Sequence, residues 1–502
     1  MTVRKLPLPS FPDLLFAALL AVVCGRAGSL EMLLADGDTG WHIRTGEWIL
    51  RCGAVPRYDL FSFSRPHAPW MAWEWLADVL FARLYAWHGL TAVAAGCAAA
   101  LCLAAGLLAA WLLDRGAGLW LAAGLALAAA SASTVHYLAR PHVFSILFFT
   151  AGGWVLDRDR HRPTRLLWAL PALTALWANV HGGFILWLAV LWLRAAASAL
   201  ERDRAACRRY SRLAALCSAA TLVNPYGWNL HRHIAGYLAS GWIQSHVQEF
   251  QPPEIRTENM LVFALLLAAG LALAGRAAAR GRWFEPLLVW GLALAALRSA
   301  RHVPFYAIGA APLIAGECAR WWRAAAIRRA ARSPVRILWE LGRQLGERRA
   351  LTAWAPLLGA LVCASAISPV ADFPAARFPV HAVAAAGNVL APPGAAPRLL
   401  TSDQWADYVI FRLDSRPRVF FDGRSDFYGE VVGNDYQALL DASPRAREVL
   451  ARYRFDVALL PHEWPLERVL EGDGGWERVY RDPLASLFVR RAKENGAACR
   501  KR

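Results

Sequence analysis

The sequence is poor in charged residues, and above all in acidic ones. Only 19% of its 502 residues are charged, and 38 Asp and Glu stand against 55 Lys and Arg, which gives a formal net charge of +17. Hydrophobic residues make up 57% of the chain, and 24 residues are Trp. A soluble domain is typically about one quarter charged and about half apolar. The composition therefore argues against a soluble protein and predicts a membrane protein.

Cysteine is scarce and is not arranged for metal binding or redox chemistry. The nine cysteines include no C-x-x-C pair, so the sequence contains neither a zinc motif nor a dithiol motif. Six lie in apolar segments, and Cys207 lies in a basic segment that we expect in the cytoplasm. Only Cys52 and Cys499 are expected in an oxidising compartment, where they either pair or stay free.

Long hydrophobic runs recur along the chain. A helix needs about 20 apolar residues to cross the hydrocarbon of a membrane. Runs near or above this length occur at 11–34, 89–113, 117–137, 259–275, 284–298 and 351–370, with shorter ones between them. No small-residue cleavage site follows the first run, so we expect it to be a retained span. The sequence predicts a polytopic α-helical membrane protein with about eleven spans.

Arginine clusters determine the expected orientation, because short basic loops stay in the cytoplasm. The clusters lie at Arg4/Lys5, 158–162, 202–212, 276–282 and 320–349. All of these clusters lie on the cytoplasmic side if the N-terminus is cytoplasmic and if residues 165–178 and 183–199 form two short helices. The positive charge then reflects how the protein is oriented in a bacterial-type inner or plasma membrane. It therefore argues against nucleic acid as a partner.

The opposite side, which is then external, collects unusual polar residues. Asp36-Gly37-Asp38 directly follows the first span, and carboxylates at a membrane surface are costly to desolvate. Other external connections hold Arg140, His142, His181, Glu249, Arg301 and His302. Arginine on this side runs against the positive-inside rule, and its planar guanidinium group matches a phosphate. We predict one external polar site that is assembled from several loops.

The residue types of this predicted site suit the transfer of a group from a phosphate carrier. Asp36 or Asp38 can deprotonate an acceptor hydroxyl, or both can bind Mg2+ or Mn2+ together with Glu249. The basic side chains would neutralise a leaving phosphate, and they are Arg140, His142, His181, Arg301 and His302. The alternative interpretation is that the acids are simply solvated and the arginines contact lipid headgroups.

After about residue 371 the composition becomes that of a soluble domain. Strands are expected at 398–401, 418–421, 455–460 and 487–490, and helices at 403–411, capped by Ser402, and at 444–453. This alternation predicts a small extracytoplasmic α/β domain. The expected domains are therefore 1–370, transmembrane with a large first external loop at 35–88, and 371–502. A polar turn with Asp422 and Arg424 follows the second strand, where α/β folds place ligand contacts, although a plain turn explains it equally well.

The acidic motif after the first span resembles that of the GT-C superfamily of membrane glycosyltransferases, which use polyprenyl-phosphate-linked sugars. The resemblance covers the topology of about 1–370 and implies that Asp36 or Asp38 acts as base or metal ligand. A fainter similarity links Ser402-Asp-Gln-Trp405-Ala-Asp407-Tyr408 to the Trp-Trp-Asp-Tyr-Gly motif of oligosaccharyltransferases. The second Trp and the Gly are missing here, which puts recognition of a peptide acceptor in doubt. The acceptor contacts expected in this domain are Trp405, Asp407, Asp422 and Arg424.

The resemblance implies a transferase that moves a sugar from a polyprenyl-phosphate carrier to a glycan, lipid or protein acceptor on the outer face. Its partners would be the lipid-linked sugar donor and membrane lipids. One alternative is a lipid or oligosaccharide flippase, which should show internal repeats and intramembrane charges on both sides of the midplane. Another is a membrane scaffold whose external domain binds a partner. The sequence has no clear repeat, and a scaffold leaves the one-sided polar residues unexplained.

Overall fold

The computed structural model describes residues 8–491. The chain divides into two compact units. The helical unit comprises Met1–Leu33 and Thr91–Pro369, and the α/β unit comprises Leu34–Leu90 and Val370–Arg502. The first external loop predicted from the sequence thus groups with the C-terminal residues, whereas its place in the chain assigned it to the transmembrane domain. Arg4, Lys5 and Cys499 lie outside the described residues, and Cys52 is a free, exposed thiol.

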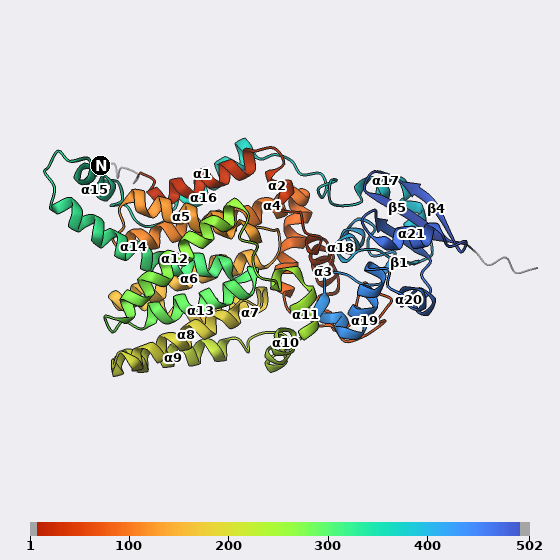
Figure 1. The fold of residues 1–502 in the computed structure, drawn as a ribbon, viewed down its shortest axis with the longest axis horizontal. Coiled ribbons are helices and arrows are strands. Elements are labelled where there is room, and N and C mark those ends of the chain that lie inside the picture. Colours follow the sequence, from red (N-terminus) through yellow and green to blue (C-terminus); the bar gives the residue numbers. More distant parts are fainter. Residues whose placement is uncertain (1–7, 492–502) are drawn as a thin grey trace, which may run out of the picture. The chain divides into compact units, whose positions relative to one another are not determined.

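The helical unit is built from helices that run side by side (Figure 1). Its elements are α1 (Phe11–Gly25), α2 (Ser29–Met32), α5 (Leu119–Ser133), η1 (Thr134–His136), α6 (His142–His161), η2 (Arg165–Ala169), α7 (Leu170–Val180), α8 (Phe184–Leu200), α9 (Arg204–Ala220), α10 (Trp228–Ala239), α11 (Gly241–His246), η3 (Gln248–Phe250), α12 (Glu258–Ala278), α13 (Phe284–Arg298), η4 (Ala300–His302), α14 (Val303–Ile327), α15 (Pro334–Leu345) and α16 (Trp354–Ala366). Helix α4 (Trp75–Asp114) begins in the α/β unit. Its backbone is not helical at His88 and Gly89, next to the boundary between the units.

Within residues 8–491, three helical segments are long and apolar enough to cross a membrane. They are Trp75–Asp114, Leu119–His136 and Glu258–Ala278, and shorter apolar helices lie at Phe11–Gly25, Phe184–Leu200, Trp354–Ala366 and Val380–Leu390. Leu265 and Leu294 are each 72% exposed, as expected where a side chain faces lipid. These features are those of a helical membrane protein, and the count of about eleven spans stays a prediction.

The first hydrophobic run ends earlier than predicted. Helix α1 begins with a capping box, in which the Asp13 N–H donates to Ser10 Oγ at 3.2 Å and the Ser10 N–H donates to Asp13 Oδ2 at 2.8 Å. The helix ends at Gly25, and Gly28 adopts a left-handed φ of 76°. Because Arg26 is already extended, with a ψ of 124°, the helix stops here, and the prediction of one span over 11–34 is wrong at its C-terminal end.

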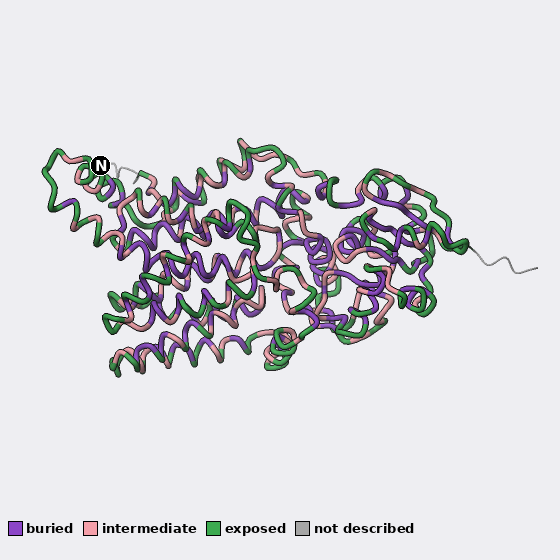
Figure 2. Tube along the Cα trace, viewed as in Figure 1, coloured by how far each residue is buried: buried purple, intermediate pink, exposed green. Residues whose placement is uncertain are grey.

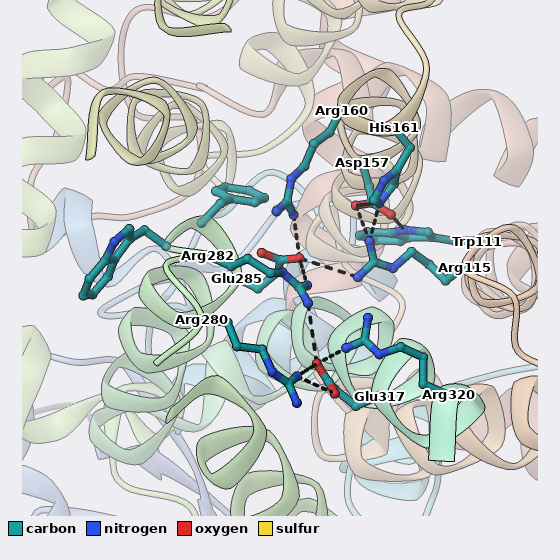
Figure 3. Close-up of polar contacts among 12 residues, drawn as sticks. Trp111, Arg115, Asp157, Arg160, His161, Arg280, Arg282, Glu285, Glu317 and Arg320 are labelled. Atoms are coloured by element: carbon teal, nitrogen blue, oxygen red, sulfur yellow. Dashed lines mark hydrogen bonds and ion pairs between the residues drawn. The ribbon is translucent and has the colours of Figure 1, made fainter. Parts of the chain in front are cut away.

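A network of ion pairs joins several helices of the helical unit (Figure 3). An Oε1 atom of Glu285, in α13, lies 2.5 Å from Arg160 Nη1 and 2.6 Å from Arg282 Nη2. Glu317, in α14, lies 3.2 Å from Arg280 Nη1. Arginines from separate basic segments of the sequence thus meet around two buried carboxylates. The charges of the two carboxylates are thereby neutralised within the fold, which gives this network a structural role.

The α/β unit contains a five-stranded sheet of order β2-β1-β3-β5-β4. The strands are β1 (Arg398–Leu400), β2 (Arg418–Val419), β3 (Val457–Pro461), β4 (Trp476–Arg481) and β5 (Ala485–Arg490). The pairs β2-β1 and β1-β3 are parallel, whereas β3-β5 and β5-β4 are antiparallel. Strand β3 is buried along its whole length, and Figure 2 marks buried residues in both units. The predicted α/β domain is confirmed as a mixed sheet with helices.

The helices of this unit extend the sequence prediction. They are α3 (Asp38–Cys52), the first part of α4, α17 (Val380–Leu390), α18 (Asp403–Arg412), α19 (Ser425–Leu440), α20 (Ala446–Tyr453) and α21 (Pro465–Glu471). The predicted cap of α18 is confirmed, because Ser402 Oγ accepts the N–H of Trp405 at 3.3 Å. Helices α17, α19 and α21 and strand β4 were not predicted.

Glycine allows α3 to pack closely against two neighbouring helices. A Cβ atom built on Gly37 would overlap the backbone oxygen of Gln404, and one built on Gly40 would lie 2.6 Å from that of Asp407. On another side of α3, a Cβ atom on Gly46 would overlap the backbone of α4. These approaches are too short for any residue with a side chain. The glycines of the acidic segment therefore position α3 in the unit.

We expect Gly40→Ala to lower the melting temperature of the purified full-length protein, because the added methyl group must separate α3 from α18. Overpacking of this kind costs about 1–3 kcal/mol. Gly387→Ala, in α17 of the same unit, is the matched control, since a Cβ atom there meets only a Leu413 side-chain carbon at 3.9 Å. Thermal unfolding in detergent compares the two, and equal melting temperatures would contradict the packing argument.

Candidate functional site

The acidic motif forms the start of α3. Asp36 Oδ1 accepts the backbone N–H of Asp38 at 2.9 Å, a local bond that favours the beginning of a helix. The N–H of Gly37 donates to Gln404 Oε1 at 2.7 Å, which ties the motif to α18. Asp36 is half-buried, whereas Asp38 is only 4% exposed. The two carboxylates therefore have different environments.

Asp38 and Asp407 reach the same small space beside Gly423. The N–H of Gly423, which lies between β2 and α19, donates to Asp407 Oδ1 at 3.1 Å. A Cβ atom built on Gly423 would overlap Asp38 Oδ1 and would lie 2.7 Å from Asp407 Oδ2. Among the residues that the structure describes, Asp407 Oδ2 is buried and has no hydrogen-bond partner. The two carboxylates are thus packed against Gly423, and Asp38 Oδ1 fills the position that a side chain at 423 would take.

Negative charge accumulates around this space. Burial raises the pKa of Asp407 well above its usual range, and the nearby charges of Asp38 and Asp422 raise it further. Burial also raises the pKa of Asp403. Each effect disfavours a charged carboxylate. The raised pKa values favour the protonated form of these carboxyl groups.

The other residues predicted as acceptor contacts hold the α/β unit together. Trp405 Nε1 donates to the backbone oxygen of Arg377 at 2.8 Å. Arg424 Nη2 donates to Asp422 Oδ2 at 2.6 Å and to Asp59 Oδ1 at 2.8 Å. Four aromatic rings surround its guanidinium group, those of Phe61, Trp70, Phe427 and Tyr428. Arg424 therefore anchors the first loop to the C-terminal residues.

The histidine that follows the acidic motif is buried against two carboxylates. His42 Nδ1 lies 2.5 Å from Asp78 Oδ1, and His42 Nε2 lies 3.6 Å from Glu74 Oε2. The three side chains come from α3 and from the start of α4 and are 11% exposed or less. The spacing of Glu74 and Asp78, one helical turn apart, is the signal in the sequence. These contacts make His42 a link between the two helices.

A separate cluster gathers in the helical unit. We define the Glu249 cluster as Arg140, Glu249, Arg301 and His136. Arg301 Nη1 lies 3.6 Å from Glu249 Oε1, Arg140 Nη1 lies 3.9 Å from Glu249 Oε2, and His136 Nε2 lies 3.8 Å from the same oxygen. The residues come from η1, η3, η4 and the connection before α6. The sequence had not singled out His136.

The predicted histidines lie on or near this cluster. His142 Nε2 is 2.6 Å from the backbone oxygen of His136, and the two rings are 3.9 Å apart. The ring of His181 is 6.4 Å from that of His142, and its Nδ1 is 2.7 Å from Ser145 Oγ. His302 follows Arg301 directly. The structure therefore brings the five predicted phosphate-binding residues into one region of the helical unit.

Positive charge exceeds negative charge in the Glu249 cluster. Burial raises the pKa of Glu249, but Arg301 and Arg140 outweigh burial and hold this pKa below its usual range. Burial and the charge of Arg301 lower the pKa of His302 to about 4. Within the described residues, Arg301 Nη1 is buried without a hydrogen-bond partner, as is His302 Nδ1. Two guanidinium groups with one carboxylate and a spare donor suit an anion.

The partners of Glu249 are cationic, which is the environment of an ion-paired carboxylate. In the part of the chain from residue 8 to residue 491, no group of three or more His, Cys, Asp or Glu side chains is arranged to hold a metal ion.

The Glu249 cluster and the ion-pair network around Glu285 and Glu317 lie at opposite ends of helices α6 and α13. Helix α6 starts at His142 and carries Arg160 near its other end, while α13 has Glu285 near its start and leads to Arg301. A helix of 15 residues is about 22 Å long at 1.5 Å per residue. The two ends of the helical unit therefore differ in chemistry. Arginines and carboxylates meet in the network around Glu285 and Glu317, whereas arginines and imidazole groups gather around the single carboxylate of Glu249.

No protein-family model matches the sequence, and no curated protein matches it. Solved structures do resemble it. The archaeal oligosaccharyltransferase AglB from Archaeoglobus fulgidus, in complex with an inhibitory peptide and a dolichol-phosphate, is 13% identical with a TM-score of 0.57, over 93% of this chain and 73% of AglB. An apo oligosaccharyltransferase from the same organism is 12% identical with a TM-score of 0.53, over 89% and 69%. ArnT from Cupriavidus metallidurans, bound to undecaprenyl phosphate, is 14% identical with a TM-score of 0.48, over 96% and 98%.

At 12–13% identity, the likeness to the two archaeal structures concerns the fold. The chain shares the fold of these two archaeal oligosaccharyltransferase structures, which agrees with the resemblance drawn from the acidic motif. The roles of individual residues come from their contacts within this chain.

We expect Asp407→Asn to make the stability of the protein less dependent on pH. Because the fold raises the pKa of Asp407, the stability that its protonated form provides at low pH is lost as the pH rises through the folded-state value. Asn stays uncharged and keeps an oxygen for the N–H of Gly423. In EDTA, the variant should melt a few degrees above the wild type in alkaline buffer and close to it in acid. Asp441→Asn, at an exposed residue of the same unit, is the control, and parallel pH profiles of Asp407→Asn and the wild type would contradict the assignment.

Proposed function

We propose that this protein is a membrane glycosyltransferase that moves a sugar from a polyprenyl-phosphate carrier to an acceptor on the outer face of the membrane. The observation that carries the proposal is the Glu249 cluster, in which two guanidinium groups share one carboxylate at 3.6 and 3.9 Å. The likeness in fold adds support, since both archaeal structures are of oligosaccharyltransferases and one contains dolichol-phosphate.

The cluster suits the phosphate of a lipid carrier in position as well as in charge. Its residues lie in connections at the ends of apolar helices, and a lipid phosphate lies where such helices leave the hydrocarbon. Arg301 packs over the Phe250 ring at 4.6 Å, which holds its guanidinium group in place while one of its nitrogens stays without a hydrogen bond. A phosphate oxygen would supply that bond. In the predicted orientation, this cluster and the α/β unit are both external.

The carboxylates of the acidic motif complete the proposed chemistry. In an inverting transfer, the acceptor oxygen forms a bond to the anomeric carbon of the sugar while the bond from this carbon to the phosphate oxygen of the carrier breaks. The acceptor proton passes to Asp36 or Asp38, and the bonding electrons leave with the phosphate, whose charge Arg140 and Arg301 neutralise. A bound Mg2+ or Mn2+ would stabilise the negative charge that develops on the leaving phosphate.

We expect Asp38→Asn and Asp36→Asn each to reduce sugar transfer, with at least one of them lowering the rate by about 100-fold or more, as the loss of a general base does. The assay incubates purified full-length protein with labelled polyprenyl-phosphate sugars and follows cleavage of the donor. Membrane abundance should not change, and Asp441→Asn should behave as the wild type. Full activity of both variants would rule out the acidic motif as the source of the catalytic base. Donors that bind to the wild type but are never cleaved would favour a transporter.

We expect Arg301→Gln to weaken binding of polyprenyl phosphate, because the variant loses a charged donor in a buried place. A hydrogen bond to a charged group contributes about 1.5–3 kcal/mol, so the affinity should fall roughly 10- to 100-fold. Native mass spectrometry or a competition assay measures the binding. Polyprenol, which has the same tail without phosphate, should bind both proteins equally, and Arg343→Gln, in α15, is the control for loss of charge. An equal loss with polyprenol would indicate a structural effect instead.

A further inference from the structure

Helix α15 has an apolar face and a polar face. Ile337, Leu341 and Leu345 recur at intervals of four residues and therefore lie on one side of the helix, whereas Arg336 and Arg343 lie on another. The helix has 12 residues, so at 1.5 Å per residue it is about 18 Å long. This length is too short to cross the hydrocarbon of a membrane. A short helix with two such faces is typical of segments that lie along a membrane surface.

One side of α15 packs on the helical unit. Trp120, in α5, donates its Nε1–H to the backbone oxygen of Leu338 at 3.2 Å, and Trp322, in α14, donates to that of Val335 at 3.2 Å. Gly342 is buried, and a Cβ atom built on it would lie 2.8 Å from the ring of Trp120. These contacts determine which side of α15 faces the protein.

The remaining apolar side of α15 is open. We define the α15 stripe as Ile337, Leu338, Leu341 and Leu345, whose side chains are each between 40% and 50% exposed. A contiguous group of large apolar side chains on the surface marks a place of interaction. Because removal of apolar surface from water is favourable, the acyl chains of lipids are a suitable cover for this stripe.

The segment around α15 is strongly basic. Residues 328–349 contain seven arginines and two glutamates. Arg336 Nε lies 2.9 Å from Glu340 Oε1, and Arg343 Nη1 lies 3.7 Å from Glu347 Oε1. Both glutamates are thus already paired with an arginine of α15, and the other arginines of the segment have no acid left within it.

Three of these arginines lie in the loop between α14 and α15. We define the basic loop by Arg328, Arg329 and Arg332, which are all exposed. They form no ion pair with any residue between 8 and 491. A second copy of this chain would bring the same positive charge to a shared contact, which opposes self-association. Phosphate groups of anionic lipids are complementary to this charge.

Tryptophans around α15 indicate the depth of the headgroups. Trp120 and Trp321 are exposed, and Trp322 and Trp339 line a small hollow between α5, α14 and α15. Tryptophan is enriched where a protein leaves the hydrocarbon of a membrane. The apolar stripe, the basic loop and these rings therefore fit the same boundary between acyl chains and water.

Helix α15 follows the end of the helical unit that carries the ion-pair network. Helix α14 begins directly after Arg301, contains Glu317, and leads to α15 (Figure 1). The Glu249 cluster lies at the other end of α14. In the orientation predicted from the basic clusters, α15 is on the cytoplasmic side, where the leaflet carries anionic lipids.

We propose that α15 lies in the cytoplasmic surface of the membrane and binds anionic phospholipids. The α15 stripe enters the boundary of the acyl chains, and the basic loop binds the phosphate groups beside it. This surface is separate from the Glu249 cluster, which we assign to the phosphate of the carrier. The proposal does not depend on the proposed function.

Binding of phosphatidylglycerol and of phosphatidylcholine to the purified full-length protein tests the charge. Native mass spectrometry in a non-ionic detergent follows both titrations. The wild type should prefer phosphatidylglycerol, and raised salt should weaken this preference. A triple variant of the basic loop should lose affinity for phosphatidylglycerol by at least about tenfold; it carries Arg328→Gln, Arg329→Gln and Arg332→Gln. The control removes three exposed arginines of the α/β unit and should bind as the wild type does; it carries Arg416→Gln, Arg447→Gln and Arg468→Gln.

A second variant tests the stripe without changing any charge. Hydrogen exchange is measured in vesicles of phosphatidylcholine and in an equal mixture with phosphatidylglycerol. The anionic lipid should slow exchange of the α15 amides in the wild type, and Leu341→Gln/Leu345→Gln should lose this protection. Val431→Gln/Val479→Gln, at two exposed residues of the α/β unit, is the matched control and should keep it. Melting curves in detergent check that each variant folds.

Equal binding of both phospholipids by the wild type, or unchanged affinity of the basic-loop variant, would overturn the proposal. A dimer of the wild type that Leu341→Gln/Leu345→Gln converts to a monomer would assign the stripe to a second copy instead.

The carrier site and the α15 surface are separated by one further comparison. Arg301→Gln should bind phosphatidylglycerol as the wild type does, and the basic-loop variant should keep its affinity for polyprenyl phosphate. Loss of both lipids in either variant would overturn the separation of the two sites. Phosphatidylglycerol binding without cleavage of any sugar donor would keep the α15 surface and overturn the transferase.

Discussion

The close contact between α3 and α18 is the constraint on which the candidate site depends. Because Gly40 would clash with the backbone of Asp407 if it had a side chain, the contact exists only with glycine at this position. The same contact carries Asp38 into the interior of the α/β unit. It explains why glycines lie inside and just after the acidic motif and why two acids come together from opposite parts of the chain.

The cost of burying charge separates the structural groups from the candidate functional ones. Glu285 meets two arginines at 2.5 and 2.6 Å, and Arg424 is bound by two carboxylates inside aromatic rings, so each of these charges has partners of opposite sign within the fold. The Glu249 cluster has a surplus of positive charge and a buried guanidinium nitrogen without a hydrogen bond, and Asp407 has a buried oxygen without one. The two arginines around the single carboxylate of Glu249 are what the proposed phosphate would pair with.

Local patterns predicted much of the fold, and they failed where the backbone departs from regular geometry. The cap at Ser402 and the strand at 455–460 follow from short-range signals, and the structure has both. The first span ends early because the backbone becomes extended at Arg26. Helix α19 was not predicted, and Gly429 interrupts its regular geometry with a φ of 72°. The candidate phosphate-binding residues were found because arginine and histidine on the less basic side are unusual.

The sequence by itself determined the membrane class, the sorting of charge along the chain and the candidate acids and arginines. These follow from the length of hydrophobic runs, the bias of basic loops and the chemistry of single residues, all of which are local properties. Only the tertiary structure decided which carboxylates are neighbours. It surrounds Glu249 with arginines and places Asp407 beside Asp38, because distances between remote segments depend on backbone packing that no local pattern encodes.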